Sequence, residues 1–221
     1  NTWIKMTQNG RTEWYYASAN GSLKQDGWQK IGDSYYYFDG NGMMQTGWVQ
    51  DDKYYCDPAS GRMVTGWKLL PLPEGVSAAE GRKSINNNYW FYFNESTGEK
   101  LYARDERVVI KTIGNASYGF DENGIMVIGW AQTADGNPEI AGYSYFADKT
   151  EGNLKLGQRI SSSWYATVGP EGDSANLSTG NVEWFYFKNN GHPAAGNGSV
   201  YEVERIGDKR YLFNEKGNPV Y

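Results

Sequence analysis

The chain has 221 residues, a net charge of −5 and an aromatic content of 16%, so Leu, Ile and Val are scarce. The acidic balance argues against a nucleic-acid partner, because no basic strip is available to follow a phosphate backbone. No stretch approaches the roughly 20 apolar residues that a membrane span requires. An acidic, aromatic-rich composition with 28 glycines suits a chain of many tight turns that binds sugars or organic cations.

Residues 1–67 contain a short repeat that is most regular from Trp28 onward. Each unit has a Gly-Trp pair, a polar stretch, an aromatic triplet and a tight turn, and it closes with Met-x-Thr-Gly-Trp. The tryptophans Trp28, Trp48 and Trp67 follow one another at intervals of 20 and 19 residues. A fixed short period of this kind is typical of stacked repeats.

Each unit is predicted to be a β-hairpin. The triplets are β-prone, and the Asp-Gly and Asn-Gly pairs that follow supply the positive φ angles of hairpin turns. Along one strand, Tyr36 and Phe38 face one way and Tyr35 and Tyr37 the other, so one of these sets must fill the interior. A single hairpin of about 20 residues is not stable alone, which predicts a linear stack of neighbours.

The regular pattern is interrupted after Trp67. Pro, Gly, Ser and Asn dominate residues 68–88, which indicates an inserted loop. The pattern returns with the aromatic run Tyr89–Phe93 and again at residues 118–120, and Gly129-Trp130 closes that unit.

The C-terminal part is a more divergent version of the same plan. Residues 130–164 form a diverged copy in which Gln158 replaces the Trp of the Gly-Trp pair. A second irregular insertion spans about residues 166–182 and precedes the run Trp184–Phe187. The last aromatic core is at residues 211–213.

Together these features predict an all-β solenoid of stacked β-hairpin repeats with two irregular loop insertions. Eight hairpin cores are expected, near residues 16, 37, 55, 92, 119, 145, 186 and 212. Three segments follow from the regularity of the repeats: residues 1–67 are regular, 68–164 are diverged and hold the first insertion, and 165–221 are diverged terminal repeats with the second.

The repeated motif resembles the cell-wall-binding repeats of Gram-positive surface proteins, which include choline-binding and glucan-binding repeats. The resemblance is strong over residues 14–67, moderate at 89–130 and 143–146, and weak at 184–221. It implies a non-catalytic module that recognises choline on teichoic acid-type polymers through aromatic cages between repeats. It also implies a secreted, wall-associated protein, of which this chain is the attachment part of a larger enzyme or adhesin.

Two further expectations concern the ends of the chain. The sequence begins at Asn1 without Met, which indicates a processed or trimmed piece. Stacked repeats with exposed ends often pair end to end, which predicts a homodimer through the terminal repeats.

The resemblance also implies a set of ligand-binding side chains. In chain order these are Trp28, Tyr35, Met44, Trp48, Tyr55 and Trp67. The best junction is expected to combine Trp28 and Tyr35 with Tyr55 and Trp48, with Met44 close by. Between Trp48 and Trp67 the position of Tyr35 is taken by Lys53, whose charge would repel a cation. Capture of a quaternary ammonium would rest on cation–π attraction of about 0.5–2 kcal/mol per ring.

Two alternatives to choline binding stay open. The same rings would bind α-glucan or another wall polysaccharide by stacking on the C–H faces of sugars. In the other alternative the chain is a structural spacer or a protein-interaction rod of a surface protein. Lys53, Gln158 and the two insertions favour this last reading.

No catalytic residue, metal site or cofactor is predicted. The only histidine, His192, is expected to be a solvated turn residue, and no nucleophile motif lies near it. No sequence argument pairs two carboxylates for glycoside hydrolysis. The only cysteine, Cys56, occupies the position that Phe38 fills one unit earlier and is expected to be a small buried hydrophobe.

Overall fold

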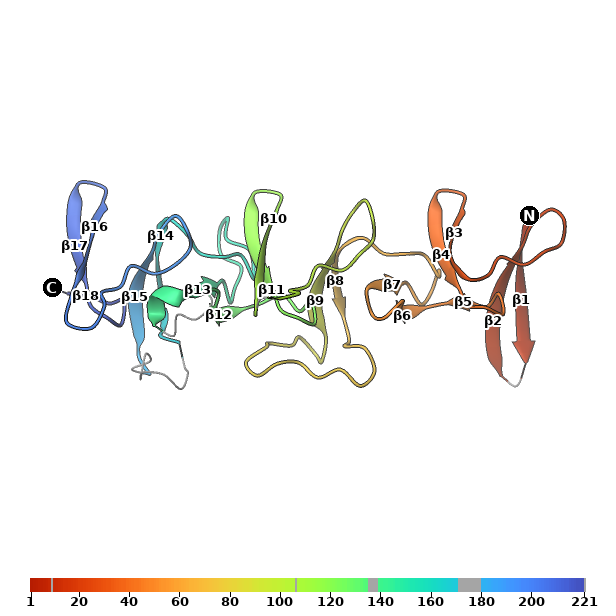
Figure 1. Cartoon of the computed structure of the whole chain (residues 1–221), viewed down its shortest axis with the longest axis horizontal. Coiled ribbons are helices and arrows are strands. Elements are labelled where there is room, and N and C mark those ends of the chain that lie inside the picture. Colours follow the sequence, from red (N-terminus) through yellow and green to blue (C-terminus); the bar gives the residue numbers. More distant parts are fainter. Residues whose placement is uncertain (9, 106, 135–138, 171–179, 221) are drawn as a thin grey trace. The chain divides into compact units, whose positions relative to one another are not determined.

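A computed structural model describes residues 1–8, 10–105, 107–134, 139–170 and 180–220 of the chain (Figure 1). Their regular structure is β-strand, apart from one short 3-10 helix, η1 (Ile140–Gly142). The strands are β1 (Thr2–Gln8), β2 (Arg11–Ala17), β3 (Gly27–Ile31), β4 (Ser34–Phe38), β5 (Met44–Gln45), β6 (Gly47–Val49), β7 (Tyr54–Cys56), β8 (Gly66–Leu70), β9 (Tyr89–Phe93), β10 (Val109–Ile113), β11 (Ala116–Phe120), β12 (Gly129–Gln132), β13 (Tyr143–Phe146), β14 (Ser163–Val168), β15 (Val182–Phe187), β16 (Glu202–Ile206), β17 (Lys209–Phe213) and β18 (Pro219–Val220). Within the described ranges, no helix is long and apolar enough to cross a membrane.

The strands form small separate sheets, each built on one hairpin. The hairpins pair β1 with β2, β3 with β4, β6 with β7, β8 with β9, β10 with β11, β12 with β13, β14 with β15, and β16 with β17. Strands β5 and β18 each add a third strand to the sheets of β4 and β17. Each hairpin contains one of the eight predicted aromatic cores. The predicted fold class, an all-β solenoid of stacked hairpin repeats, is therefore confirmed.

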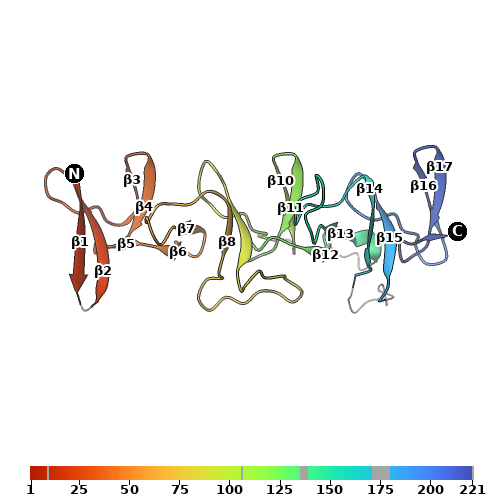
Figure 2. The same ribbon diagram turned by 180° about the vertical axis from the view of Figure 1, so that it is seen from behind.

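The chain packs as two compact units. Unit 1 consists of residues 1–76 and 90–101, and unit 2 of residues 77–89 and 102–221. Within unit 1 the β1–β2 and β3–β4 hairpins point to opposite sides, as Figure 1 and the reverse view in Figure 2 show. These units are defined by packing, whereas the three segments named from the sequence describe how regular the repeats are.

The interior is filled by alternate residues of the aromatic strands. Phe38 is fully buried and Tyr36 is 6% exposed, whereas Tyr35 is 42% exposed. The set of Tyr36 and Phe38 is thus the interior set, and each buried ring of this size contributes about 1.5–3 kcal/mol. The other fully buried phenylalanines are Phe91, Phe93, Phe120, Phe146, Phe185, Phe187 and Phe213. Cys56 has no exposed surface either, so the prediction of a small buried hydrophobe is confirmed.

The methionines that close the repeats fix the spacing of successive hairpins. Gly61, in the turn after β7, has φ +72, and a Cβ added there would overlap the sulfur of Met44. Met44 belongs to the preceding hairpin, so its thioether packs directly on the backbone of the next turn. The same arrangement recurs for Met63 with Gly98 and for Met126 with Gly157.

Both insertions begin later than the sequence indicated. Strand β8 continues to Leu70, so residues 68–70 are strand rather than loop. Strand β14 likewise continues to Val168, because Ala166 and Val168 pair with Trp184 and Val182. Cross-strand pairing therefore extends past the point where the aromatic pattern ends. Residues 171–179 of the second insertion lie outside the described residues.

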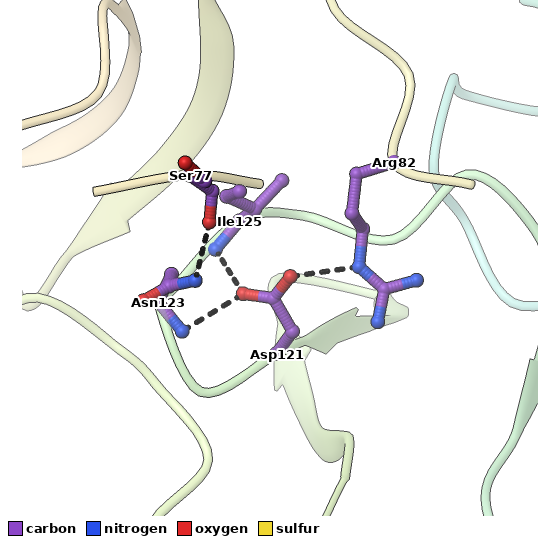
Figure 3. Close-up of polar contacts among 5 residues, drawn as sticks. All are labelled: Ser77, Arg82, Asp121, Asn123 and Ile125. Atoms are coloured by element: carbon purple, nitrogen blue, oxygen red, sulfur yellow. Dashed lines mark hydrogen bonds and ion pairs between the residues drawn. The ribbon is translucent and has the colours of Figure 1, made fainter. Parts of the chain in front are cut away.

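Polar contacts fasten the first insertion to a turn within unit 2 (Figure 3). Nε of Arg82 donates to Oδ2 of Asp121 at 2.7 Å, and the Asp121 side chain has no exposed surface. Oδ1 of Asp121 accepts the backbone N–H groups of Asn123 and Ile125 at 3.0 and 2.9 Å. The Asn123 amide donates to the carbonyl of Ser77 at 3.3 Å. The insertion is thus held at two points, Ser77 and Arg82.

Candidate ligand site: aromatic junctions between hairpins

Trp28 lies between its own hairpin and the next one in unit 1. Its ring centroid is 5.1 Å from that of Tyr37, across the β3–β4 pair, and 5.2 Å from that of Tyr54 on β7. Both contacts are edge-to-face, with interplanar angles of 67° and 64°. Such pairs contribute about 0.5–1.5 kcal/mol beyond burial. The indole is therefore a wall shared by two successive hairpins.

The turn between β6 and β7 fixes the polar edge of Trp28. The indole N–H donates to Oε1 of Gln50 at 2.7 Å. Gln50, Asp51 and Asp52 have φ of 54, 55 and 57°, the left-handed region, which costs an L-residue roughly 1–2 kcal/mol. This left-handed turn presents the Gln50 amide to the indole, and the hydrogen bond together with the two ring contacts fixes the orientation of Trp28.

Tyr35 and Met63 meet at the same junction. Tyr35 is two residues from Tyr37 on β4 and so shares the face on which Trp28 lies. The backbone N–H of Met63 donates to the carbonyl of Tyr35 at 2.8 Å, which ties the two hairpins together. We name this place, with Trp28, Tyr35 and Tyr54 as its rings, the Trp28 junction.

Unit 2 contains an open junction of the same kind. Trp164, Trp184, Tyr211 and Pro219 line a cavity of about 380 Å³, within the usual size range of small-molecule pockets. The Trp164 ring is 5.2 Å from Tyr211 and 5.7 Å from the fully buried Phe213. Trp184 is 54% exposed, so the outer side is open to solvent. We name this site the Trp164 junction.

The two junctions have the same register. Trp28 pairs with Tyr37 across its hairpin, and Trp164 pairs with Tyr186 across β14 and β15. Trp184 is therefore equivalent to Tyr35, and Tyr211 is equivalent to Tyr54. In each junction the first ring is the Trp on the first strand of a hairpin, Trp28 or Trp164. The second ring, Tyr35 or Trp184, lies on the other strand of the same hairpin. The third ring, Tyr54 or Tyr211, lies on the second strand of the next hairpin.

The Trp164 junction is missing from the sequence-based prediction. The expectation that Gln158 removes a Trp from this repeat was wrong, because Ser163-Trp164 fills the Gly-Trp position while Gln158 forms a bridge with Tyr118. A usable signal was present. The run Trp184–Phe187 repeats Trp90–Phe93, and each follows an insertion, so a Trp was to be expected before the second insertion as well.

The six predicted ligand residues are distributed over several junctions. Trp28 and Tyr35 share one junction, but its third ring is Tyr54 and not Tyr55. Tyr55 instead contacts Trp48 at 5.2 Å, because adjacent strand residues face opposite ways. Met44 pairs with Phe38 in the sheet of its own hairpin, and Trp67 packs on Trp90 and Tyr92 at 6.3 and 5.1 Å.

At the junction of Trp48, a lysine occupies the space between the rings. Nζ of Lys100 lies 4.9 Å from the centroid of Trp48 and 5.8 Å from that of Phe91, and Lys100 is only 8% exposed. The backbone N–H of Lys100 donates to the carbonyl of Lys53 at 2.8 Å, the same bond that Met63 makes to Tyr35. Here Lys53 and Lys100 therefore replace Tyr35 and Met63.

The Trp28 junction combines neutral rings with one nearby lysine. Burial, with the charge of Glu99, raises the pKa of Tyr54, so its ring stays neutral over the physiological range. Lys30 is paired with Tyr35 across that hairpin, and its Nζ lies 5.7 Å from the centroid of the Tyr35 ring. Neutral rings of this kind attract cations through their faces and stack on apolar sugar faces.

Histidine, cysteine and acidic side chains are the groups that metal binding or acid–base catalysis would use. In the part of the chain that the structure covers, no three His, Cys, Asp or Glu side chains gather closely enough to hold a metal ion. His192 is half-buried, and its Nδ1 lies 3.0 Å from the carbonyl oxygen of Tyr143. The expectation of a solvated turn residue was wrong here, because the ring folds back onto the preceding hairpin.

Comparison with known proteins agrees with this geometry. The sequence profile of the choline-binding repeat matches residues 25–67, the segment that holds the Trp28 junction. A search of the curated proteins finds no match.

Solved structures from Streptococcus pneumoniae have the same fold. Choline-binding protein F is 22% identical with a TM-score of 0.60, and the match covers 98% of this chain and 57% of that one. The modular autolysin LytC, solved with a synthetic peptidoglycan ligand, is 19% identical with a TM-score of 0.56, covering 93% of this chain and 36% of that one. The chain thus spans between about a third and somewhat over half of these proteins. Residues 25–67 thus match the choline-binding repeat, and the chain as a whole has the same hairpin-repeat fold as choline-binding protein F.

Proposed function

We propose that this chain is a non-catalytic cell-wall-binding module that captures choline of teichoic acid-type polymers in aromatic junctions between hairpins. The observation that carries the proposal is the shared register of the Trp28 and Trp164 junctions. One lies in the segment matched by the choline-binding repeat, and the other opens into a cavity of about 380 Å³ lined by two Trp rings and a Tyr ring.

The chemistry of the walls favours a quaternary ammonium. Such a group has no N–H to donate, so aromatic faces must hold it, at about 0.5–2 kcal/mol per ring. The residues that line the Trp164 cavity carry no formal charge, and the chain as a whole is acidic, with a net charge of −5. One such site is weak, but two on the same chain would bind a polymer more tightly through effective concentration.

The proposal extends to the setting of the protein. We infer that it is secreted, lies in the cell wall and serves as the attachment part of a larger protein. It includes a homodimer through the terminal repeats. Val203 and Leu212 support this, because they form a cross-strand pair on the last hairpin with 57% and 45% of their surfaces exposed. Light scattering with and without choline tests the dimer, and a monomer mass under both conditions contradicts it.

Titration of the intrinsic tryptophan fluorescence tests the choline site. Choline chloride and tetramethylammonium are expected to give saturable changes, with NaCl as the ionic-strength control and dextran as the sugar probe. Trp28→Ala and Trp184→Ala should each remove part of the response. Val182→Ala, an exposed position on the same strand as Trp184, should leave it unchanged. Saturation with dextran alone would assign the junctions to glucan, and a flat spectrum with every ligand would contradict small-ligand binding.

A further inference from the structure

We propose that the Trp48 junction is a cation cage closed by the protein's own lysine. Lys100 takes the place of an external ammonium ligand, so this junction holds two hairpins together without choline and does not bind it. The statement about choline rests on the proposed function, whereas the statement about the internal cation stands on the geometry of unit 1 alone.

The position of Lys100 is equivalent to a position that elsewhere holds Met, Leu, Pro or, opposite Phe146, Arg159. It pairs with the buried Phe93 as Met63 pairs with Cys56, and Met63 is its counterpart in the preceding hairpin. In the Trp164 junction the wall residue beside the cavity is Pro219, which pairs with Phe213 in the same way. At the Trp48 junction, the residue in this column therefore brings a charge to the rings of Trp48 and Phe91.

The geometry is that of a bound cation. The ammonium lies within 6 Å of two ring centroids, Trp48 at 4.9 Å and Phe91 at 5.8 Å, which is the range in which cation–π attraction acts. Phe91 is fully buried and Lys100 is 8% exposed. Burying an ammonium is costly unless its charge is compensated, and aromatic faces supply part of that compensation.

Lys53 adds a second barrier to an external cation. It stands where Tyr35 and Trp184 stand in the other two junctions, so an exposed aromatic wall is absent. Its backbone is bonded directly to Lys100. A quaternary ammonium entering here would meet two positive charges and one aromatic ring fewer. The Trp48 junction therefore excludes choline, the ligand proposed for the Trp28 and Trp164 junctions.

The test is a titration of the full chain with 15N-labelled tryptophan, read at the indole N–H of Trp48. This group donates to the carbonyl of Pro71 at 3.0 Å and reports locally on the junction. In the wild type its signal should not respond to choline or tetramethylammonium. In Lys100→Met, which restores the residue type of the neighbouring repeat, the signal should shift saturably. Lys53→Tyr/Lys100→Met, which copies the Trp28 junction, should bind more tightly than Lys100→Met.

Stability in choline-free buffer gives an independent reading. Lys100→Met should lower the urea midpoint, and added tetramethylammonium should restore part of the loss. Lys100→Arg keeps a cation and should leave the Trp48 signal unresponsive. Lys111→Met, an exposed lysine on β10, is the matched control and should change neither reading.

Two results would overturn the inference. One is a saturable shift of the Trp48 signal in the wild type, because the junction would then be open. The other is a Lys100→Met variant that matches Lys111→Met in midpoint and in its lack of response. If no tryptophan of the wild type responds to choline, the proposed function fails, but a lower midpoint of Lys100→Met that tetramethylammonium restores would still support the internal cation.

Discussion

Arg82 and Asp121 form an ion pair in which the carboxylate has no exposed surface and the guanidinium side chain is 13% exposed. The two residues lie 39 positions apart in the sequence, so the pair joins the first insertion to the turn after β11. The same carboxylate holds that turn by accepting two backbone N–H groups (Figure 3). One side chain thus organises both a repeat turn and the loop that interrupts the repeats.

Removing the guanidinium should strongly destabilise unit 2. Arg82→Leu leaves the buried Asp121 carboxylate without its partner, and breaking one side of a buried pair costs about 3–5 kcal/mol. Urea unfolding monitored by circular dichroism measures the loss. The control is Lys149→Leu, which breaks the pair with Glu151 whose side chains are 59% and 68% exposed, and it should have little effect because surface pairs contribute little. Equal losses in both variants would contradict the role assigned to Arg82.

The contact of Met44 with Gly61 predicts a second, separable effect. Gly61→Ala should cost about 1–2 kcal/mol for the left-handed backbone, and more because the new methyl group would overlap Met44. Gly47→Ala is the matched control, since Gly47 has φ +77 but nothing within 4 Å of an added Cβ. In the background of Met44→Ala, the cost of Gly61→Ala should fall to that of Gly47→Ala. If it stays unchanged in that double-mutant cycle, the methionine does not set the spacing.

Stability should decline in alkaline solution. Burial raises the pKa of the Cys56 thiol from 9.0 to about 12 and that of the Tyr145 phenol from 10.0 to about 12. The unfolded chain releases these protons at lower pH than the folded chain, so the folded state binds more protons in between. The stabilisation is fully present below pH 9.0 and is lost progressively as the pH rises toward 12.

Urea midpoints across this pH range measure the alkaline decline. Cys56→Ala should lose some stability at neutral pH but show a shallower decline above pH 9.0, because only Tyr145 and other phenols then titrate. The burial of Cys56 further predicts that thiol reagents modify it only when the hairpin opens. A wild-type rate of modification that is fast and insensitive to urea would contradict this.

Local chemistry made the hairpins predictable. The turn after Phe38 needs only Asp-Gly and Asn-Gly, and the burial of Phe38 and Tyr36 follows from strand alternation. The third ring of the Trp28 junction was harder to predict. A one-residue error in register replaces Tyr54 by Tyr55, whose side chain lies on the opposite face of the strand. Register between successive hairpins is set by contacts such as Met44 with Gly61, which the spacing of motifs does not reveal.

The remaining features depend on residues that are far apart in sequence. Trp164 replaces the expected Gly-Trp because β14 extends into the predicted insertion and pairs with β15. Lys100 reaches the ring of Trp48 across the whole first insertion. The sequence period predicts neither contact, because an insertion separates Trp164 from its partners on β15 and another separates Trp48 from Lys100. The sequence predicted that Lys53 repels a cation at this junction, and Lys100 adds a second positive charge to that prediction.

Lys30 gives a prediction about affinity at the Trp28 junction. Its Nζ lies 5.7 Å from the Tyr35 centroid, whereas the equivalent residue opposite Trp184 is the uncharged Ala166. Two unit charges about 4 Å apart repel by roughly 1 kcal/mol in water, which corresponds to a roughly fivefold change in affinity. Lys30→Ala should therefore tighten choline binding at Trp28 by a few-fold.

The salt dependence of choline affinity distinguishes an effect of the Lys30 charge from an effect of the shape of its side chain. The gain from Lys30→Ala should shrink as the ionic strength rises, because exposed charges are screened over about 10 Å at 0.1 M salt. Ala166→Lys is the reciprocal variant and should weaken the Trp164 junction while leaving the indole signal of Trp28 unaffected. Both readings come from one 15N-tryptophan titration at low and high salt. A gain that is independent of salt would show that the lysine stem covers the Tyr35 ring, and that its charge does not oppose the ligand.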